Sequence, residues 1–360
     1  MTRFIFQKLG YGILVLLGVI VVIFFLFNIL PGDPARMMLG QRADSASVAA
    51  VKRELGTDKP LYVQFAAYLN DLSPVSFHVT GRPGNSFNYD TSKYGVPVFA
   101  MAYKQMMLAV KYPCLRQSYQ TRRNVSELLI ESFINTFILA VVAMAFAMIV
   151  GVALGIVCAL YRNSFVDRIS LVFSVLGMSL PSFFAAILNA WIFAFVLAHI
   201  THLNMTGSLF SVDDLGRGEY LDLKNLILPA FTLGIRPLAI IVELTRNSLL
   251  EVLSQDYIRT ARAKGLSPRR IIFKHALKNA MNPVITAATG WLASLLAGAV
   301  FVEYIFDWKG IGLVIVNALD KYDFPVIMGA VLFISVILIL INIMADILYG
   351  VIDPRVRIKA

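Results

Sequence analysis

The chain has 360 residues, of which 58% are hydrophobic and 15% are charged. A typical soluble domain has about 25% charged residues, and a mean hydropathy of +0.73 indicates more apolar surface than a soluble globular protein can bury. The formal net charge of +10 does not require a nucleic-acid partner, because basic loops are typical of the cytoplasmic side of membrane proteins.

Long apolar runs predict the membrane-spanning helices, since a helix needs about 20 apolar residues to cross the hydrocarbon core. Uncharged runs of sufficient length occupy residues 9–30, 132–161, 169–212, 279–302 and 324–345. A further run, 226–250, is apolar but contains Arg236, Glu243 and Arg246. We therefore predict an all-α polytopic membrane protein with six transmembrane helices. The first run is too long for a signal peptide, so we expect it to stay as an anchor.

The distribution of basic residues predicts the orientation. Lysine and arginine gather before the first helix, at residues 162–168, after the fourth helix and in the tail, whereas loop 197–225 is acidic. The positive-inside rule then places both termini in the cytoplasm. Segments 31–131, 197–225 and 303–323 are expected to face outward.

The predicted domain organisation follows from these spans. Its parts are a cytoplasmic N-terminus with helix 1 (1–30), an extended extracytoplasmic segment (31–131), a transmembrane core (132–350) and a cytoplasmic tail (351–360). Within the extracytoplasmic segment we expect short helices at 43–55 and 62–72, loop or short strands at 74–94, a helical segment at 98–112 and an amphipathic lead at 123–131.

The cytoplasmic loop 251–282 has the pattern of two short helices separated by a glycine. The first helix is expected to run to about Lys264, where Gly265 can adopt the positive φ that ends it. Ser267 can cap the second helix, 268–279, with Pro268 in its first turn. Such a compact knob suits docking into a cleft of another protein.

This loop resembles the cytoplasmic signature of ABC importer permeases, the EAA loop. Gly265 corresponds to its glycine, and Arg259-Thr260-Ala261 replaces Glu-Ala-Ala. The sequence DYIRTARAKGL at 256–266 is similar to the dipeptide/oligopeptide (peptide/nickel) permease family. Other segments that resemble this family are LPGDP at 30–34, LGTDKPL at 55–61, SLPSFF at 179–184, LPA at 228–230, the turn 303–312, with Lys309 in place of the usual proline, and DPR at 353–355. Only about 74–122 lies outside the resemblance, as an expected insertion.

The resemblance implies a type I ABC importer permease fold, in the bacterial inner membrane, and a set of partners. These are a second homologous permease subunit, two ABC ATPase subunits and an extracytoplasmic protein that delivers dipeptides or oligopeptides. The residues implied to dock onto the ATPases are Arg259, Thr260, Ala261, Ala263, Lys264, Gly265 and Leu266. The sequence lacks a GxxxxGK[ST] run. We therefore expect no catalytic residue and no cofactor on this chain, with ATP and Mg bound by the partner subunits.

Arg236 is the candidate substrate contact, because a charge inside a membrane helix is costly and indicates function by default. It could hold a peptide carboxylate, pair with Glu243 seven residues later, pair with another helix, or lie near the outer surface. Glu243 and Arg246 lie near the cytoplasmic end, where we expect them to snorkel or to pair. For Asp346, near the same end, we expect a structural partner rather than a role in a proton relay. Pro181 and Pro237 are expected to interrupt helices.

The cysteines and histidines do not predict a metal site. Cys114 and Cys158 lie in different predicted environments, so we expect no disulfide. His199 and His202 are three residues apart and lack the further ligands that a metal would need.

Other functions remain open from the sequence. The same machinery could import nickel chelates or oligosaccharides. An ion-coupled secondary transporter would use Arg236, Glu243 and Asp346 as a relay, but it would be expected to show inverted repeats, which we do not find. A membrane receptor with 31–131 as its sensor would not need six helices. We expect membrane lipid, and no nucleic acid, around the chain.

Overall fold

The computed structural model describes residues 2–29, 36, 44–79, 86–212 and 218–352. In this part of the chain the helices long and apolar enough to cross a membrane are Phe6–Asn28, Val125–Leu160, Lys224–Leu253, Pro268–Ala297 and Phe324–Ile347. A sixth span results if the bent pair Phe165–Ser179 and Ser182–Val196 is counted as one. The prediction of a helical polytopic membrane protein is thus confirmed, with five or six spans. The orientation of the termini stays a prediction.

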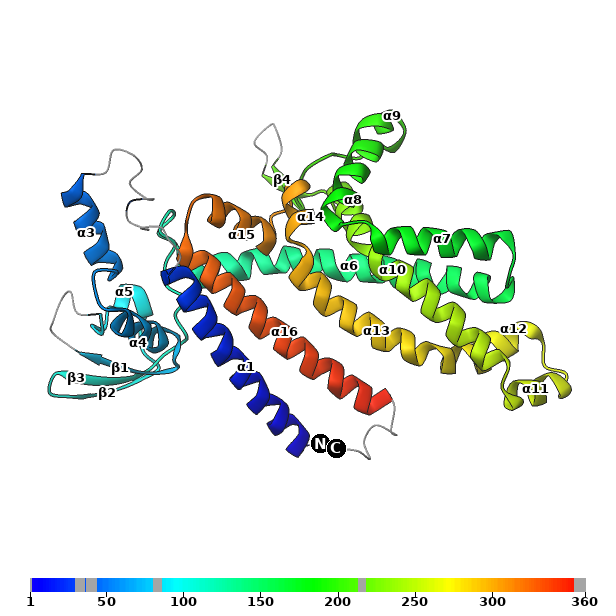
Figure 1. The fold of residues 1–360 in the computed structure, drawn as a ribbon, viewed down its shortest axis with the longest axis horizontal. Helices are drawn as coiled ribbons and strands as arrows, with labels where there is room; N and C mark the ends of the chain where they lie inside the picture. Colours follow the sequence, from blue (N-terminus) through cyan, green and yellow to red (C-terminus); the bar gives the residue numbers. More distant parts are fainter. Residues whose placement is uncertain (1, 30–35, 37–43, 80–85, 213–217, 353–360) are drawn as a thin grey trace. The chain divides into compact units, whose positions relative to one another are not determined.

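The chain divides into two compact units. Figure 1 shows the helices and strands of both, coloured along the sequence. Unit 1 comprises Met1–Leu9, Phe133–Leu313 and Ile337–Ala360, and unit 2 comprises Gly10–Ser132 and Val314–Val336. The helices that contribute residues to both units are α1 (Thr2–Ile29), α6 (Val125–Leu160), α15 (Ile311–Asp320) and α16 (Phe324–Ile352).

Unit 1 is built around α10 (Lys224–Leu253), which packs against α7 (Phe165–Ser179) and α13 (Leu277–Gly298). Its other elements are α8 (Ser182–Asn189), the π-helical η2 (Ala190–Val196), α9 (Ala198–Thr201), β4 (Phe210–Val212), β5 (Glu219–Leu221), α11 (Asp256–Ala263), α12 (Pro268–Arg270), the π-helical η3 (Ile271–Ala276) and α14 (Val300–Ile305). Strands β4 and β5 form an antiparallel pair. The apolar core includes Leu139, Leu233 and Val302.

The two prolines singled out in the sequence behave differently. Helix α7 ends at Ser179 and α8 begins at Ser182, with a bend of 112° between the two helical segments. Pro181 explains this break, because proline pushes the preceding residue out of the helical region, and Leu180 has an extended ψ of 128°. Pro237 lies inside the continuous helix α10, so the prediction that it interrupts a helix is wrong. Membrane helices tolerate such prolines where neighbouring groups satisfy the freed carbonyl.

Unit 2 contains the short helices α3 (Ser45–Leu55), α4 (Leu61–Leu72) and α5 (Thr91–Tyr94), together with a small sheet. Strands β1 (Val75–Val79), β2 (Phe99–Tyr103) and β3 (Met106–Val110) are antiparallel and lie in the order β1-β3-β2. The prediction of a helix at 98–112 is therefore wrong, whereas β1 lies where loop or short strands were predicted, and the helical fold carries a small sheet in this unit. Residues 99–110 form a hairpin whose turn residue Lys104 has a φ of 53°, and alternate side chains point to opposite faces.

The two faces of this sheet differ. The strand register places Val75, Phe77, Phe99, Met101, Tyr103 and Met106 on one face, and all six are exposed. Ser76, His78 and Ala109 lie on the opposite face and are buried. One face of the sheet is thus apolar and exposed, and residues of the other face are buried.

Helices α1 and α16 meet α4 inside unit 2. Ile23 and Phe24 of α1 share a buried apolar cluster with Met328 and Leu332 of α16 and with Tyr68 of α4. Short helix α4 therefore lies directly against the membrane-span residues of this unit.

Candidate functional site

Loop 251–282, for which the sequence predicts a cytoplasmic location, forms a compact knob in unit 1. Helix α11 ends at Ala263, and Gly265 has the expected positive φ of 74°. Pro268 occupies the first turn of α12, as predicted, although the Ser267 side chain makes no capping hydrogen bond. The segment after the glycine is not a separate short helix: residues 268–297 form one apolar helical segment that crosses into α13.

The seven predicted docking residues divide into two groups by burial. Arg259, Thr260, Ala263, Lys264 and Gly265 are exposed. Ala261 is buried and belongs to an apolar cluster with Ile258 and Ile271, against which Leu266 also packs. Ala261 and Leu266 therefore hold the knob in place, and the other five residues form its free surface, which we call the knob surface.

Further bonds fix the knob and the helices behind it. Asn279 of α13 donates a hydrogen bond of 2.8 Å to the Tyr257 hydroxyl of α11. Arg246 of α10 makes a two-point ion pair with Asp167 of α7, with N–O distances of 2.6 Å and 2.8 Å. Bidentate pairs of this kind are geometrically specific. Of the two expectations for Arg246, snorkelling or pairing, the structure shows pairing.

The prediction for Asp346 is confirmed in the same way. Its carboxylate lies 2.8 Å from the Lys8 ammonium, and both residues belong to unit 1. This ion pair connects the first helix with the last one. Asp346 therefore already has a structural partner.

Arg236 lies on α10 beside a small cavity of about 60 Å³. The cavity is lined by Ser182, Thr232, Leu233, Arg236, Trp291, Ser294 and Leu295, from helices α8, α10 and α13. In the part of the chain that the structure describes, no ion pair joins Arg236 to Glu243. A guanidinium beside hydroxyl groups can bind a carboxylate through several N–H and O–H donors.

Sequence reasoning missed a buried polar centre around Glu303 of α14. Its carboxylate accepts hydrogen bonds from the Thr136 hydroxyl (2.7 Å) and from the Gly312 amide (2.6 Å). The Ile311 amide in turn donates to the Thr136 oxygen at 2.9 Å. Burial raises the pKa of Glu303 to about 7, against the opposing effect of these hydrogen bonds. In the sequence, only the glutamate and the two glycines of turn 303–312 could have indicated this buried centre.

The expectations about metal and disulfide sites concern His199, His202 and the two cysteines. Among the described residues, no group of three or more His, Cys, Asp or Glu side chains could hold a metal ion. Cys114 and Cys158 are free cysteines. Neither the two histidines nor the two cysteines belong to the candidate sites described above.

Comparison with known proteins gives consistent matches along the chain. Residues 151–358 match the family described as "Binding-protein-dependent transport system inner membrane component", and residues 1–83 match its N-terminal model. The chain is 34% identical over 370 residues to the dipeptide transport system permease protein of Alkalihalophilus pseudofirmus, covering 99% of this chain and 100% of the relative. It is 35% identical over 371 residues to the di/tripeptide transport system permease protein of Pseudomonas aeruginosa, covering 99% of each.

Two further matches agree with these transport-system relatives. The glutathione transport system permease protein of Salmonella typhi is 33% identical over 359 residues, covering 100% of both chains. A solved inward-facing structure of the MetNI methionine ABC transporter is 17% identical with a TM-score of 0.50, covering 63% of this chain and 97% of that one. This structural likeness supports the fold alone, which is that of a type I ABC importer permease. By its family model and its full-length relatives, the chain belongs to the binding-protein-dependent transport system inner membrane components, the permease subunits of ABC transporters.

Proposed function

We propose that this chain is the permease subunit of an ATP-driven importer for dipeptides or other short peptides. The observation that carries this proposal is its 34% identity, over 99% of the chain, to a dipeptide transport permease. The proposed assembly contains a second homologous permease, two ATPase subunits that bind ATP and Mg, and an extracytoplasmic binding protein. This chain contributes the path for the peptide and no step of ATP hydrolysis.

We propose that the knob surface docks onto an ATPase subunit. Three features support this role: five exposed residues at the tip, the buried anchors Ile258 and Ala261 beneath them, and the helix break at Gly265. The helical segment 268–297 starts in the knob and includes Trp291 and Ser294 of the Arg236 cavity. A movement at the docked knob would therefore be transmitted to the cavity along one helical segment.

The experiment that tests the function is uptake into liposomes that contain this chain with its second permease and ATPases. The binding protein and labelled dialanine are supplied outside, with ATP inside. We expect uptake that requires both ATP and the binding protein. Uptake driven by a proton or sodium gradient without ATP would contradict the proposal. A nickel chelate or an oligosaccharide that is imported while dialanine is not would replace the substrate class.

The Arg236→Gln variant is expected to lower dialanine uptake about tenfold or more, because a hydrogen-bonded charge contributes roughly 1.5–3 kcal/mol. If Arg236 holds the peptide carboxylate, the variant also loses the preference for free dialanine over its C-terminal amide. Competition between the two ligands during uptake measures that preference. Arg168→Gln, at another exposed arginine of unit 1, serves as the control. An unchanged preference in Arg236→Gln would remove Arg236 from the peptide path.

The exposed apolar face of the β1-β3-β2 sheet is proposed as a contact surface for the binding protein. The sheet lies within the predicted extracytoplasmic segment, and its exposed face includes Phe77 and Met101. We expect the double substitution Phe77→Ser with Met101→Ser to weaken binding-protein docking about tenfold, since central apolar residues dominate interface energies. Docking is measured by surface plasmon resonance on the reconstituted transporter. Tyr62→Ser, at an exposed residue of α4, is the control, and equal affinity in both variants would refute this contact.

A further inference from the structure

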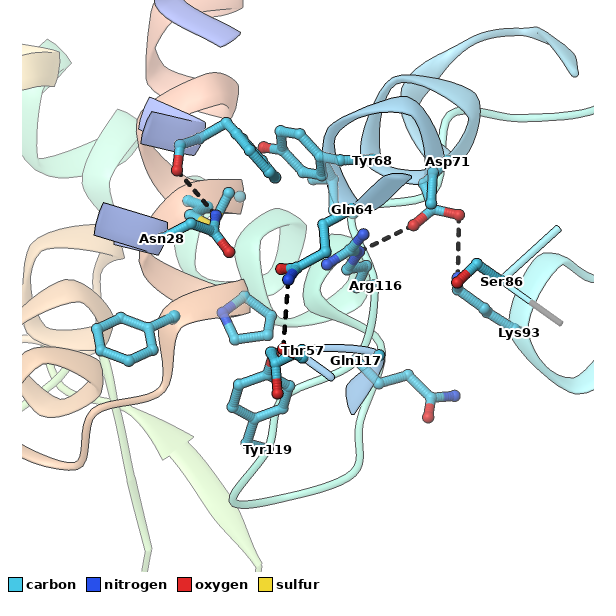
Figure 2. A pocket seen from close by; sticks show the side chains of 18 of the residues that line it. Asn28, Thr57, Gln64, Tyr68, Asp71, Ser86, Lys93, Arg116, Gln117 and Tyr119 are labelled. Carbon is cyan, nitrogen blue, oxygen red and sulfur yellow. Dashed lines mark hydrogen bonds and ion pairs between the residues drawn. The ribbon is translucent and has the colours of Figure 1, made fainter. Parts of the chain in front are cut away.

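Unit 2 contains a partly open cavity of about 460 Å³, whose lining is shown in Figure 2. This volume lies within the range of about 300–1,000 Å³ that is typical of small-molecule sites. One wall is aromatic and is formed by Phe24 and Phe27 of α1 and Phe324 of α16. Polar side chains come from α3, from the turn after it, from α4 and from residues 86–122. The cavity thus combines an apolar wall from membrane-span ends with a polar interior.

The lining carries more basic than acidic side chains. Five are basic, namely Arg53, Lys59, Lys93, Arg116 and Arg122, and two are acidic, namely Asp71 and Asp90. Clefts lined by an excess of one charge attract ions of the opposite sign. The charge of this cavity therefore favours an anionic ligand.

Asp71 does not offer its charge to a ligand, because its carboxylate is already fully engaged. It accepts hydrogen bonds from Arg116 Nε at 2.8 Å, Lys93 Nζ at 2.9 Å and the Tyr94 hydroxyl at 2.5 Å. Burial opposes ionisation of Asp71, but Arg116 and Lys93 outweigh it and hold the pKa of the carboxyl below its usual value. Asp71 therefore acts as the anchor that fixes Arg116 (Figure 2).

Arg116 and Tyr68 present donors with no partner among the described residues. Asp71 uses only the Nε of Arg116, and no acceptor from the described chain bonds its two Nη groups. The hydroxyl of Tyr68 is buried without a hydrogen-bond partner, and the residue is only 3% exposed. The guanidinium carbon of Arg116 lies 5.2 Å from the centre of the Tyr68 ring. Leaving a buried donor unsatisfied costs about 1–3 kcal/mol, which a ligand oxygen would recover.

We propose that this cavity binds an oxyanion, the carboxylate or phosphate group of a small ligand, through the Nη groups of Arg116 and the hydroxyl of Tyr68. A planar guanidinium recognises carboxylate and phosphate oxygens equally well by two-point hydrogen bonding. The aromatic wall accommodates an apolar group attached to the anion. A short peptide and an anionic phospholipid both carry this chemistry. The site is built from residues other than those around Arg236 and does not depend on the proposed transport function.

Binding to the complete transporter in phosphatidylcholine nanodiscs tests this proposal. The probes are labelled dialanine, inorganic phosphate and, by native mass spectrometry, phosphatidylglycerol. We expect at least one probe to bind saturably, and its affinity to fall about tenfold in Tyr68→Phe. Because Tyr68→Phe removes only an unsatisfied hydroxyl, the Tm without ligand should stay equal or rise. Tyr62→Phe, on the same helix but 75% exposed, should bind as wild type.

The outcomes separate the ligand sources and the competing sites. Arg116→Gln is expected to abolish binding, whereas Arg236→Gln should leave it unchanged. Saturable binding of dialanine but not of phosphatidylglycerol identifies a free carboxylate ligand. Saturable binding of phosphatidylglycerol but not of dialanine identifies a lipid headgroup. Either result supports the oxyanion site. The proposal is overturned if no probe binds saturably to wild type, or if Tyr68→Phe binds with wild-type affinity. A wild-type transporter that binds a probe but fails to import peptides would refute the transport function only.

Discussion

Ala263→Arg is expected to abolish ATP-driven uptake while the permease itself stays folded. Ala263 is exposed on the knob surface next to Lys264 and Gly265. A larger side chain at this position would therefore extend into solvent and leave the core of the permease unchanged. In a docked complex the same side chain would have to fit into a packed interface, where a few central residues carry most of the binding energy. We expect at least tenfold less ATPase to copurify with the tagged permease, with Tm unchanged.

Two further variants identify the cause of that loss. Ala263→Ser changes the volume little and should retain wild-type copurification. Ala261→Glu places a carboxylate in the buried cluster with Ile258 and Ile271, and an unpaired buried charge is strongly unfavourable. This second variant should therefore lower Tm as well as ATPase recovery. If Ala263→Arg recovers the ATPases normally, the knob surface is not the docking site.

The sequence predicted those features that local patterns determine. The long apolar runs predicted the spans, and the positive φ of Gly265 followed from its position after α11. The hairpin at β2 and β3 was predicted as a helix, because apolar composition alone does not separate a buried helix from a strand. The alternation of Phe99, Met101 and Tyr103 along one face was the stronger signal.

The polar sites depend on contacts between distant residues, and periodicity does not report these. Arg116 reaches Asp71 across 45 positions, and Thr136 reaches Glu303 across 167 positions. A sequence shows such residues only as isolated polar positions, whose partners follow from tertiary packing. Arg236 was found because a charge within an apolar run is visible locally, but its cavity was not.

Glu303→Ala is expected to destabilise the permease by about 3 kcal/mol or more, because it leaves the Gly312 amide and the Thr136 hydroxyl buried without their acceptor. Gly312→Ala should have a similarly large effect. A Cβ atom there would lie 2.7 Å from a Glu303 carboxylate oxygen and would also meet the backbone of Val300. Both variants are measured by thermal unfolding of the purified transporter. A Tm within 2 °C of wild type, about the shift expected for a loss below 1 kcal/mol, would contradict the structural role of this centre.

Glu303→Gln is the matched control, since its amide oxygen can accept from Gly312 and its NH₂ group can donate to the Thr136 oxygen. The variant also isolates the titration of Glu303. Burial raises the pKa of the folded carboxyl from its ordinary value of 4.5 to about 7, so the folded state binds the proton more tightly than the unfolded state. This stabilisation is complete below pH 4.5 and is lost as the pH rises toward 7, at most about 3 kcal/mol. Wild-type Tm should therefore fall between pH 5 and pH 8 more steeply than that of Glu303→Gln, and parallel profiles would show that Glu303 does not titrate in this range.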